Sequence, residues 1–173
     1  MTNIRISGVT NLATARAVTA LDIDFMCIDI TPNSKVFVSP IKIPDFRQWL
    51  SGIQLVLKAH HLNADQAFKL SGLLDVQHVE IALNETSDEK VSIWYGGAED
   101  VDTGSFHALL LDELPGSGVV AGNAYYKITE NELSKPEIII KSGANIDLDL
   151  ALFSDGESVD LEQLESFVKL VKS

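Results

Sequence analysis

The chain has 173 residues, of which 46% are hydrophobic, enough for one sizeable core in a single domain spanning residues 1–173. Its formal net charge of −12 argues against nucleic acid and anionic membranes as partners, because both require cationic contacts. The single cysteine, Cys27, excludes an internal disulfide and a cysteine-rich metal site. No apolar run reaches the roughly 20 residues of a membrane helix, and no signal-peptide pattern opens the chain. We therefore expect a cytoplasmic protein.

The first half of the chain alternates strands with helices. Residues 23–30 are apolar at most positions, which is typical of a parallel strand buried on both faces. Asn11 suits the N-cap of the helix before this strand. Pro44 suits the first turn of the helix after it, which we expect to turn Trp49 inward. In chain order we predict a strand at 3–7, a helix to about residue 20, a strand at 23–30, a helix at 44–50, a strand at 54–59, a helix at 64–74 and a strand at 76–83.

The second half is expected to hold as many strands but fewer helices. We predict strands at 90–95, 106–111, 137–141 and 148–153, and a last helix at 161–172. Asp160 suits the N-cap of that helix, whose apolar face comprises Leu161, Leu164, Phe167, Val168 and Val171. Eight strands that alternate with helices indicate the α/β class and a closed (β/α)8 barrel.

Two connections between the expected strands are unsuited, by length or by composition, to form helices that cover the barrel. Residues 84–89 are few, and residues 96–105 are rich in glycine and acids. We therefore predict a degenerate barrel with helices lost around strands four to six. A bare apolar flank needs cover, and a second copy is the simplest cover. Trp94 and Tyr95 lie there, so we predict a homodimer through this flank; packing of the two rings under a loop is the open alternative.

Several segments are similar to the phosphoribosylanthranilate isomerase family of tryptophan biosynthesis, whose members are (β/α)8 barrels that need no cofactor. Residues 7–11 (Ser-Gly-Val-Thr-Asn) resemble its first loop, and residues 31–40 the loop after its second strand. Residues 109–112 (Leu-Leu-Leu-Asp), followed by Gly116-Ser117-Gly118, resemble its sixth strand and the loop after it. Residues 139–143 and 154–156 resemble the two loops that hold the substrate phosphate.

This resemblance implies an Amadori-type isomerase, formally an intramolecular oxidoreductase, acting on a phosphorylated small molecule. Asp112 would be the general acid, and the ligand would contact Gly116, Gly118, Ser142, Gly143, Ser154 and Gly156. The family's general base is a cysteine, at the position of Ser7. A serine hydroxyl cannot be tuned to an anion near neutral pH as a thiol can. Val36 replaces a substrate-binding arginine, and Asp155 adds a negative charge to a phosphate loop.

We therefore predict an isomerase-like barrel without the standard isomerase activity, either repurposed for a related small molecule or non-catalytic. The alternative is a genuine isomerase that uses Asp112 as general acid. Ser7 is alternatively a small residue that packs the barrel mouth, which we favour because no histidine lies close in sequence to activate it, and Asp112 is alternatively a solvated acid at a strand end. An open pocket at the carboxyl ends of the strands would favour a ligand, whereas a mouth filled by side chains would exclude both enzymatic hypotheses.

Four further charged residues lie at or near expected strand ends, where barrel enzymes place their sites. If the alternation of the strands turns them inward, they form a polar cluster, and a buried lysine among them is a candidate Schiff-base nucleophile. These residues are Asp29, Lys58, Glu80 and Lys141. We predict no metal site, because the adjacent pair His60-His61 lacks the spacing for joint chelation.

Overall fold

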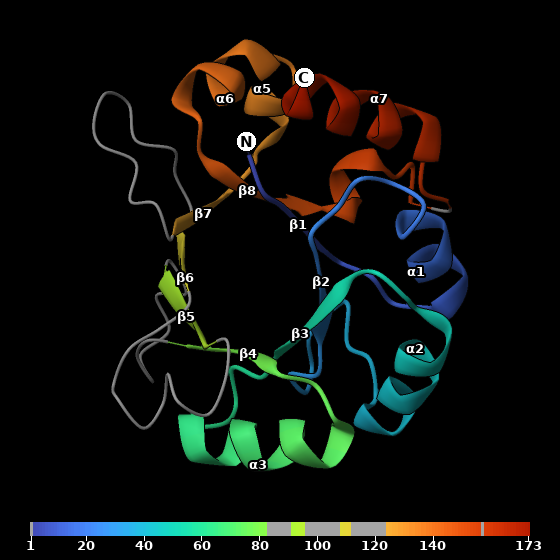
Figure 1. Ribbon diagram of the computed structural model, residues 1–173, viewed down its shortest axis with the longest axis vertical. Helices are drawn as coiled ribbons and strands as arrows, with labels where there is room; N and C mark the ends of the chain where they lie inside the picture. The colour runs from blue at the N-terminus through green and yellow to red at the C-terminus, as the bar shows by residue number, and fades with distance from the viewer. Residues whose placement is uncertain (1, 83–90, 96–107, 112–123, 157) are drawn as a thin grey trace.

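The computed structural model describes residues 2–82, 91–95, 108–111, 124–156 and 158–173. Its strands close into one barrel in which each strand pairs with the next along the chain and β8 pairs with β1 (Figure 1). The closed α/β barrel predicted from the sequence is thus confirmed. The strands are β1 (Ile4–Ser7), β2 (Phe25–Asp29), β3 (Gln54–Lys58), β4 (His78–Ala82), β5 (Val91–Tyr95), β6 (Ala108–Leu111), β7 (Ala124–Lys127) and β8 (Asn145–Asp149).

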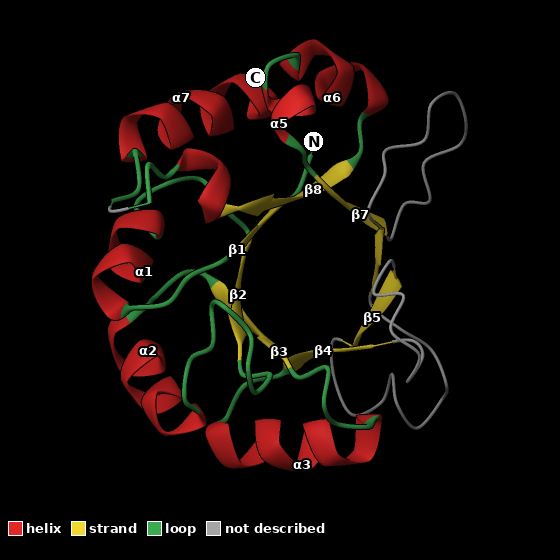
Figure 2. Ribbon diagram, turned by 180° about the vertical axis from the view of Figure 1, so that it is seen from behind, coloured by secondary structure: helices red, strands yellow, loops and turns green. Residues whose placement is uncertain are grey.

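The described helices follow the outside of the barrel beside β8 and β1 to β4, and none of them lies between β4 and β7 (Figure 2). The Asn11 side chain accepts a hydrogen bond from Thr14 N at 2.9 Å, and Asp160 accepts one from Gln163 N at 2.9 Å. Both predicted N-caps are therefore confirmed. The helices are α1 (Leu12–Val18), α2 (Ile43–Trp49), α3 (Ala64–Leu74), α5 (Glu130–Leu133), α6 (Pro136–Ser142) and α7 (Leu161–Lys172), with short 3-10 helices η1 (Pro40–Lys42) and η2 (Leu150–Phe153).

One strand runs against the direction expected of a parallel barrel. β5 pairs antiparallel with both β4 and β6, while the remaining neighbours pair parallel. The cause is the length of the connections, because a parallel crossover needs about a dozen residues or more and an antiparallel pair does not. Only residues 83–90 separate β4 from β5. Because β5 is reversed, neither the β4–β5 nor the β5–β6 connection has to cross over the barrel, and β6 again runs parallel to β7.

The seventh and eighth strands were predicted at the wrong places. Residues 137–141 lie in α6, and the true β7 is the four-residue segment 124–127. A short apolar run such as Ile138–Ile140 fits a buried strand or a helix equally well by periodicity, and Pro136 at the first helical turn decides for the helix. Strand β8 ends at Asp149, and residues 150–153 of the predicted strand form η2 instead.

Trp49 is not turned inward as predicted, and Trp94 is buried, as the packing alternative for it required. Trp49 is 57% exposed, with the Arg16 guanidinium 5.5 Å from its ring centroid, while Phe46 forms the buried face of α2. Trp94 is fully buried inside the barrel, so it is not available to a subunit interface. The predicted homodimer, if it forms, uses other residues; the side chain of Tyr95 lies outside the described part of the structure.

The strands separate two apolar layers. Alternate residues of β1 and β2, such as Ile6 and Met26, face outward and pack with helical residues such as Val168. The inner layer is smaller and aromatic, and its Phe25 and Trp94 rings meet edge to face with centroids 4.6 Å apart. This inner layer fills the barrel beneath the polar site described next. No helix in the described part of the chain is long and apolar enough to span a membrane.

Candidate functional site

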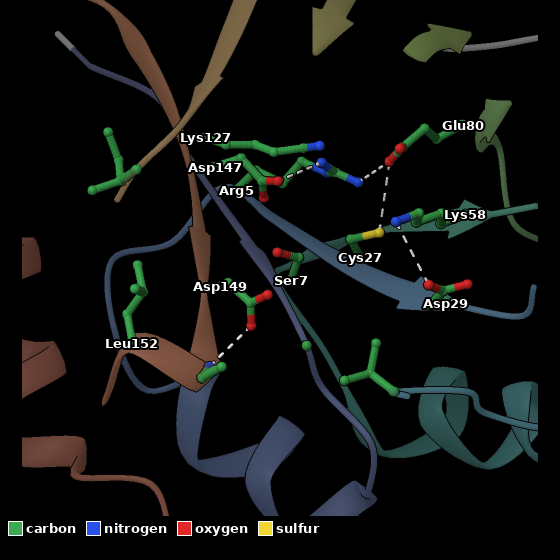
Figure 3. Close-up of a pocket in the computed structure, with 14 residues that line it drawn as sticks. Arg5, Ser7, Cys27, Asp29, Lys58, Glu80, Lys127, Asp147, Asp149 and Leu152 are labelled. Atoms are coloured by element: carbon green, nitrogen blue, oxygen red, sulfur yellow. Dashed lines mark hydrogen bonds and ion pairs between the residues drawn. The ribbon is translucent and has the colours of Figure 1, made fainter. Parts of the chain in front are cut away.

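A cavity of about 330 Å³ opens where the carboxyl ends of the strands converge (Figure 3). The last residue of five strands lines it, because the side chains of a strand alternate and the final ones here point inward. These residues are Ser7, Asp29, Lys58, Lys127 and Asp149. Four more lining residues sit two positions before a strand end, namely Arg5, Cys27, Glu80 and Asp147.

Arg5 organises the floor of this cavity. Its guanidinium forms an ion pair with Glu80, and its Nη1 lies 3.0 Å from Asp147 Oδ2. His60 Nε2 lies 2.8 Å from the other oxygen of Glu80, and the Cys27 thiol donates to Glu80 at 3.9 Å. Arg5, Glu80 and Asp147 are all nearly inaccessible to solvent, so their charges depend on each other for compensation.

This floor shifts the acidities of its members. Burial alone would raise the pKa of Glu80, but the Arg5 guanidinium and His60 outweigh burial and hold that pKa well below its usual range. Burial raises the pKa of the Cys27 thiol to about 12, against a smaller opposing effect of Arg5. Cys27 is therefore a neutral thiol at neutral pH and does not substitute as a base for the cysteine that Ser7 replaces.

Asp29 and Lys58 form the wall on the side of β2 and β3. Lys58 Nζ lies 3.6 Å from Asp29 Oδ2, and Asp29 also accepts hydrogen bonds from Thr31 N at 2.8 Å and Ser34 Oγ at 2.9 Å. Burial lowers the pKa of Lys58, but the negative charge around it, that of Glu80 first, raises it by more. A Schiff-base lysine needs a lowered pKa, so this geometry argues against that role for Lys58.

Ser7 lines the cavity, and its side chain makes a single described hydrogen bond. Its Oγ donates to the carbonyl oxygen of Leu148 at 3.5 Å, the upper limit for such a bond. A backbone carbonyl cannot take up the hydroxyl proton, so this contact does not activate Ser7 as a base or nucleophile. The residue that resembles the family's catalytic position therefore lines the pocket without an activating partner in the described residues.

In the segments that follow β7 and β8, backbone N–H groups donate hydrogen bonds to nearby carboxylates of the same segment. Asp149 accepts a hydrogen bond from Ala151 N at 2.9 Å and so caps η2. Glu132 reaches back to accept one from Thr129 N at 2.9 Å, at the start of α5. Barrel enzymes commonly hold a phosphate with the loops after strands seven and eight and a short helix. In this protein, backbone N–H groups of both loops already bind side-chain carboxylates, those of Glu132 and Asp149.

The structure separates the residues predicted to bind a phosphate. Ser142 and Gly143 end α6 ahead of β8, at the opposite end of the barrel from the cavity, because residues 137–141 form a helix. Ser154 and Gly156 follow η2 and bond to each other, with Gly156 N donating to Ser154 Oγ at 3.1 Å. None of these four lines the cavity. Asp112, Gly116 and Gly118 lie outside the described residues.

The inward direction of the strand-end residues is what the sequence left open. Asp29, Lys58 and Glu80 do gather in the cavity, whereas Lys141 is exposed on α6. Arg5, Lys127, Asp147 and Asp149 were missed as site residues. Alternation was a usable signal in β8, where Asp147 and Asp149 interleave with Ile146 and Leu148. The four-residue β7 offers too short a pattern to locate Lys127.

Comparisons with known proteins give a fold but not a sequence match. No family model and no curated protein matches the chain. Among solved structures, TrpF from Jonesia denitrificans is similar with a TM-score of 0.73 and 16% identity over 99% of this chain and 97% of that one. Phosphoribosyl anthranilate isomerase from Thermus thermophilus gives 0.69 and 17% over 98% of each chain. The chain has the fold of the phosphoribosylanthranilate isomerases.

A third isomerase structure of this fold contains a bound ligand, reduced 1-(o-carboxyphenylamino)-1-deoxyribulose 5-phosphate. It matches with a TM-score of 0.72 and 14% identity over 99% of both chains. The likeness extends over nearly the whole length, and the chain of 173 residues closes an eight-stranded barrel. At these identities the likeness concerns the fold, and the chemistry of this chain has to be argued from its own cavity.

Proposed function

We propose that this protein is an isomerase-like barrel that lacks standard phosphoribosylanthranilate isomerase activity and binds a small molecule without a phosphate group. The open cavity supports a ligand site over a barrel whose mouth is filled. Its charged lining supports a polar ligand, because charged walls without a polar partner would be costly to desolvate.

The observation that carries this proposal is the carboxylate of Asp149 on the backbone N–H of Ala151. An anion is stabilised at the N-terminus of a short helix by the helix dipole and free N–H groups. Asp149 already supplies that anion at η2, and a phosphate dianion placed beside it would be repelled. Glu132 has the corresponding place in the loop after β7.

The position that the resemblance assigns to the base lacks a group suited to abstracting a proton. Amadori-type enolisation needs a base after the ring has been opened, and the candidates at or beside that position are weak ones. Ser7 bonds to a carbonyl, and Cys27 is held neutral by burial. Both facts support a pocket that binds a different molecule from the one that the isomerases rearrange.

The test is a titration with inorganic phosphate of the wild type, Asp149→Asn and the matched exposed variant Asp65→Asn, with chloride added to keep ionic strength equal. Removing the Asp149 charge should produce phosphate binding that wild type and Asp65→Asn lack, measured by calorimetry and by a rise in Tm. Phosphate binding to the wild type that is as tight as binding to Asp149→Asn would contradict the proposal.

The alternative is a genuine isomerase with Asp112 as general acid, which is favoured by the fold that the chain shares with isomerases. It requires turnover of phosphoribosylanthranilate that disappears in Asp112→Asn. Binding of phosphate to wild-type protein would support this alternative as well.

A further inference from the structure

One carboxylate on the cavity floor has an oxygen with no protein partner. Asp147 is 4% exposed, and its Oδ2 lies 3.0 Å from Arg5 Nη1, but its Oδ1 has no hydrogen-bond partner among the described residues. Arg5 Nε is unpartnered in the same sense. Buried polar atoms are nearly always hydrogen-bonded in native proteins, so an acceptor on the wall of a cavity that no described residue satisfies is a place where a ligand can donate a hydrogen bond.

By comparison, Asp29 and Glu80 have partners on both of their carboxylate oxygens. Asp29 accepts hydrogen bonds from Thr31 and Ser34 and lies beside Lys58. Glu80 takes Arg5 on one oxygen and His60 on the other. Among Asp29, Glu80 and Asp147, the open acceptor is therefore that of Asp147, which lies next to Lys127 in Figure 3.

A positively charged hydrogen-bond donor, the Lys58 ammonium, faces the same cavity. The Lys58 side chain is 29% exposed and extends into the cavity from β3 (Figure 3). An ammonium group has three N–H donors, and the contact with Asp29 at 3.6 Å engages this one loosely. Lys58 can therefore hold an anionic oxygen at the rim while Asp147 accepts a hydrogen bond deeper in the cavity.

Building on the proposed function, we propose that the cavity binds a small hydroxy or amino monocarboxylic acid. Its carboxylate pairs with Lys58, and its hydroxyl or amino N–H donates to Asp147 Oδ1. The charges of the lining select this class. A phosphate ester brings more negative charge to the side of Asp149, a diamine brings no anion to Lys58, and a neutral polyol brings no charge to the Lys58 donors that the long contact with Asp29 leaves open.

Three probes of equal chain length separate the two contacts. D-Gluconate carries a carboxylate and hydroxyls, hexanoate carries only the carboxylate, and sorbitol carries only the hydroxyls. They are titrated into the full-length protein by calorimetry together with D-glycerate, L-serine, putrescine and ribose 5-phosphate. We expect at least one hydroxy or amino acid to bind at least tenfold more tightly than hexanoate or sorbitol. Hexanoate lacks the donor to Asp147, and sorbitol lacks the carboxylate for Lys58, so each of these two loses one charge-assisted contact.

Variants assign the contacts to residues. Lys58→Met should weaken binding of the preferred acid at least tenfold, while Lys69→Met, an exposed lysine on α3, should leave it unchanged. Asp147→Asn should reduce the preference for the hydroxy acid over its deoxy analogue. Because Asp147 is part of a buried ion-pair network and its variant is prone to unfold, the Lys58→Met result decides by itself.

The outcomes separate this inference from the proposed function. Tight binding of putrescine or sorbitol would overturn the carboxylic acid and leave a phosphate-free ligand site in place. Preferential binding of ribose 5-phosphate would overturn both. Equal binding of the preferred acid to wild type and Lys58→Met would overturn the assigned contact, and no binding of any probe would overturn the inference together with the ligand site.

Discussion

Removing the charge of Glu80 should destabilise this barrel far more than removing an equivalent charge at its surface. In Glu80→Gln the buried Arg5 guanidinium loses one of its two carboxylate partners, and His60 loses its anion. Breaking a buried pair by removing one partner costs about 3–5 kcal/mol, a large part of the roughly 5–15 kcal/mol that stabilises a typical domain. For a chain of this size the expected fall in Tm is roughly 6–20 °C.

The matched control is Asp75→Asn. Asp75 pairs with Arg47, but the two side chains are 78% and 41% exposed, so this loss should be below about 1 kcal/mol. Asparagine also tolerates the left-handed backbone of Asp75, with φ of 54°. Urea unfolding at pH 7, followed by tryptophan fluorescence, measures both variants. A loss in Glu80→Gln no larger than in Asp75→Asn would refute the reasoning.

The same pair predicts a pH dependence. The pKa of Glu80 is lower in the folded protein than in the unfolded chain, because Arg5 and His60 outweigh burial. Its contribution to the free energy of unfolding is therefore complete above the unfolded value of about 4.3 and is lost as pH falls through the lower folded pKa. The stability gap between wild type and Glu80→Gln should narrow below about pH 4. A gap that widens on acidification would contradict this assignment.

Three further predictions concern single residues. Gly8→Ala should destabilise more than Gly143→Ala, because both need positive φ but only a Cβ at Gly8 would lie 2.5 Å from Asp149 Oδ1; equal losses in urea unfolding would contradict the close contact. Cys27 should resist iodoacetamide in native protein at pH 8 and react after unfolding, since burial raises its pKa to about 12; rapid labelling of native protein, seen by mass spectrometry, would disprove its burial. Trp94→Ala should cost about 3–5 kcal/mol, whereas Trp49→Ala, at an exposed position, should cost below about 1 kcal/mol; the reverse order in unfolding would contradict the positions of the two rings.

The order of strands and helices through β4 and the final helix could be predicted from the sequence because their signals are local. Asn11 and Asp160 cap their helices as expected, and the predicted bounds of α3 match the structure. The errors arose where local signals conflict or are short. Residues 137–141 fit two periodicities, and the direction of β5 depends on how many residues join it to its neighbours.

The site was predicted less well than the fold for a related reason. A resemblance in sequence drew attention to Ser7, which lines the cavity, but it assigned the phosphate loops to residues that do not line the cavity. Which way a strand-end side chain points depends on the register of the closed barrel, and partners such as Arg5 and Glu80 are 75 residues apart. Such long-range pairing leaves no local pattern, so Arg5 and Asp147 became visible only in three dimensions.

The claim that this barrel has lost the standard isomerase reaction is tested most directly by turnover. Freshly prepared phosphoribosylanthranilate is mixed with wild-type protein and with Asp112→Asn, and the loss of substrate fluorescence is followed in both. We predict that the wild type is no faster than Asp112→Asn, since Ser7 has no activating partner in the described structure and the loops after β7 and β8 carry their own carboxylates. Turnover by the wild type that Asp112→Asn abolishes would contradict the claim and show that the family chemistry proceeds without its thiol.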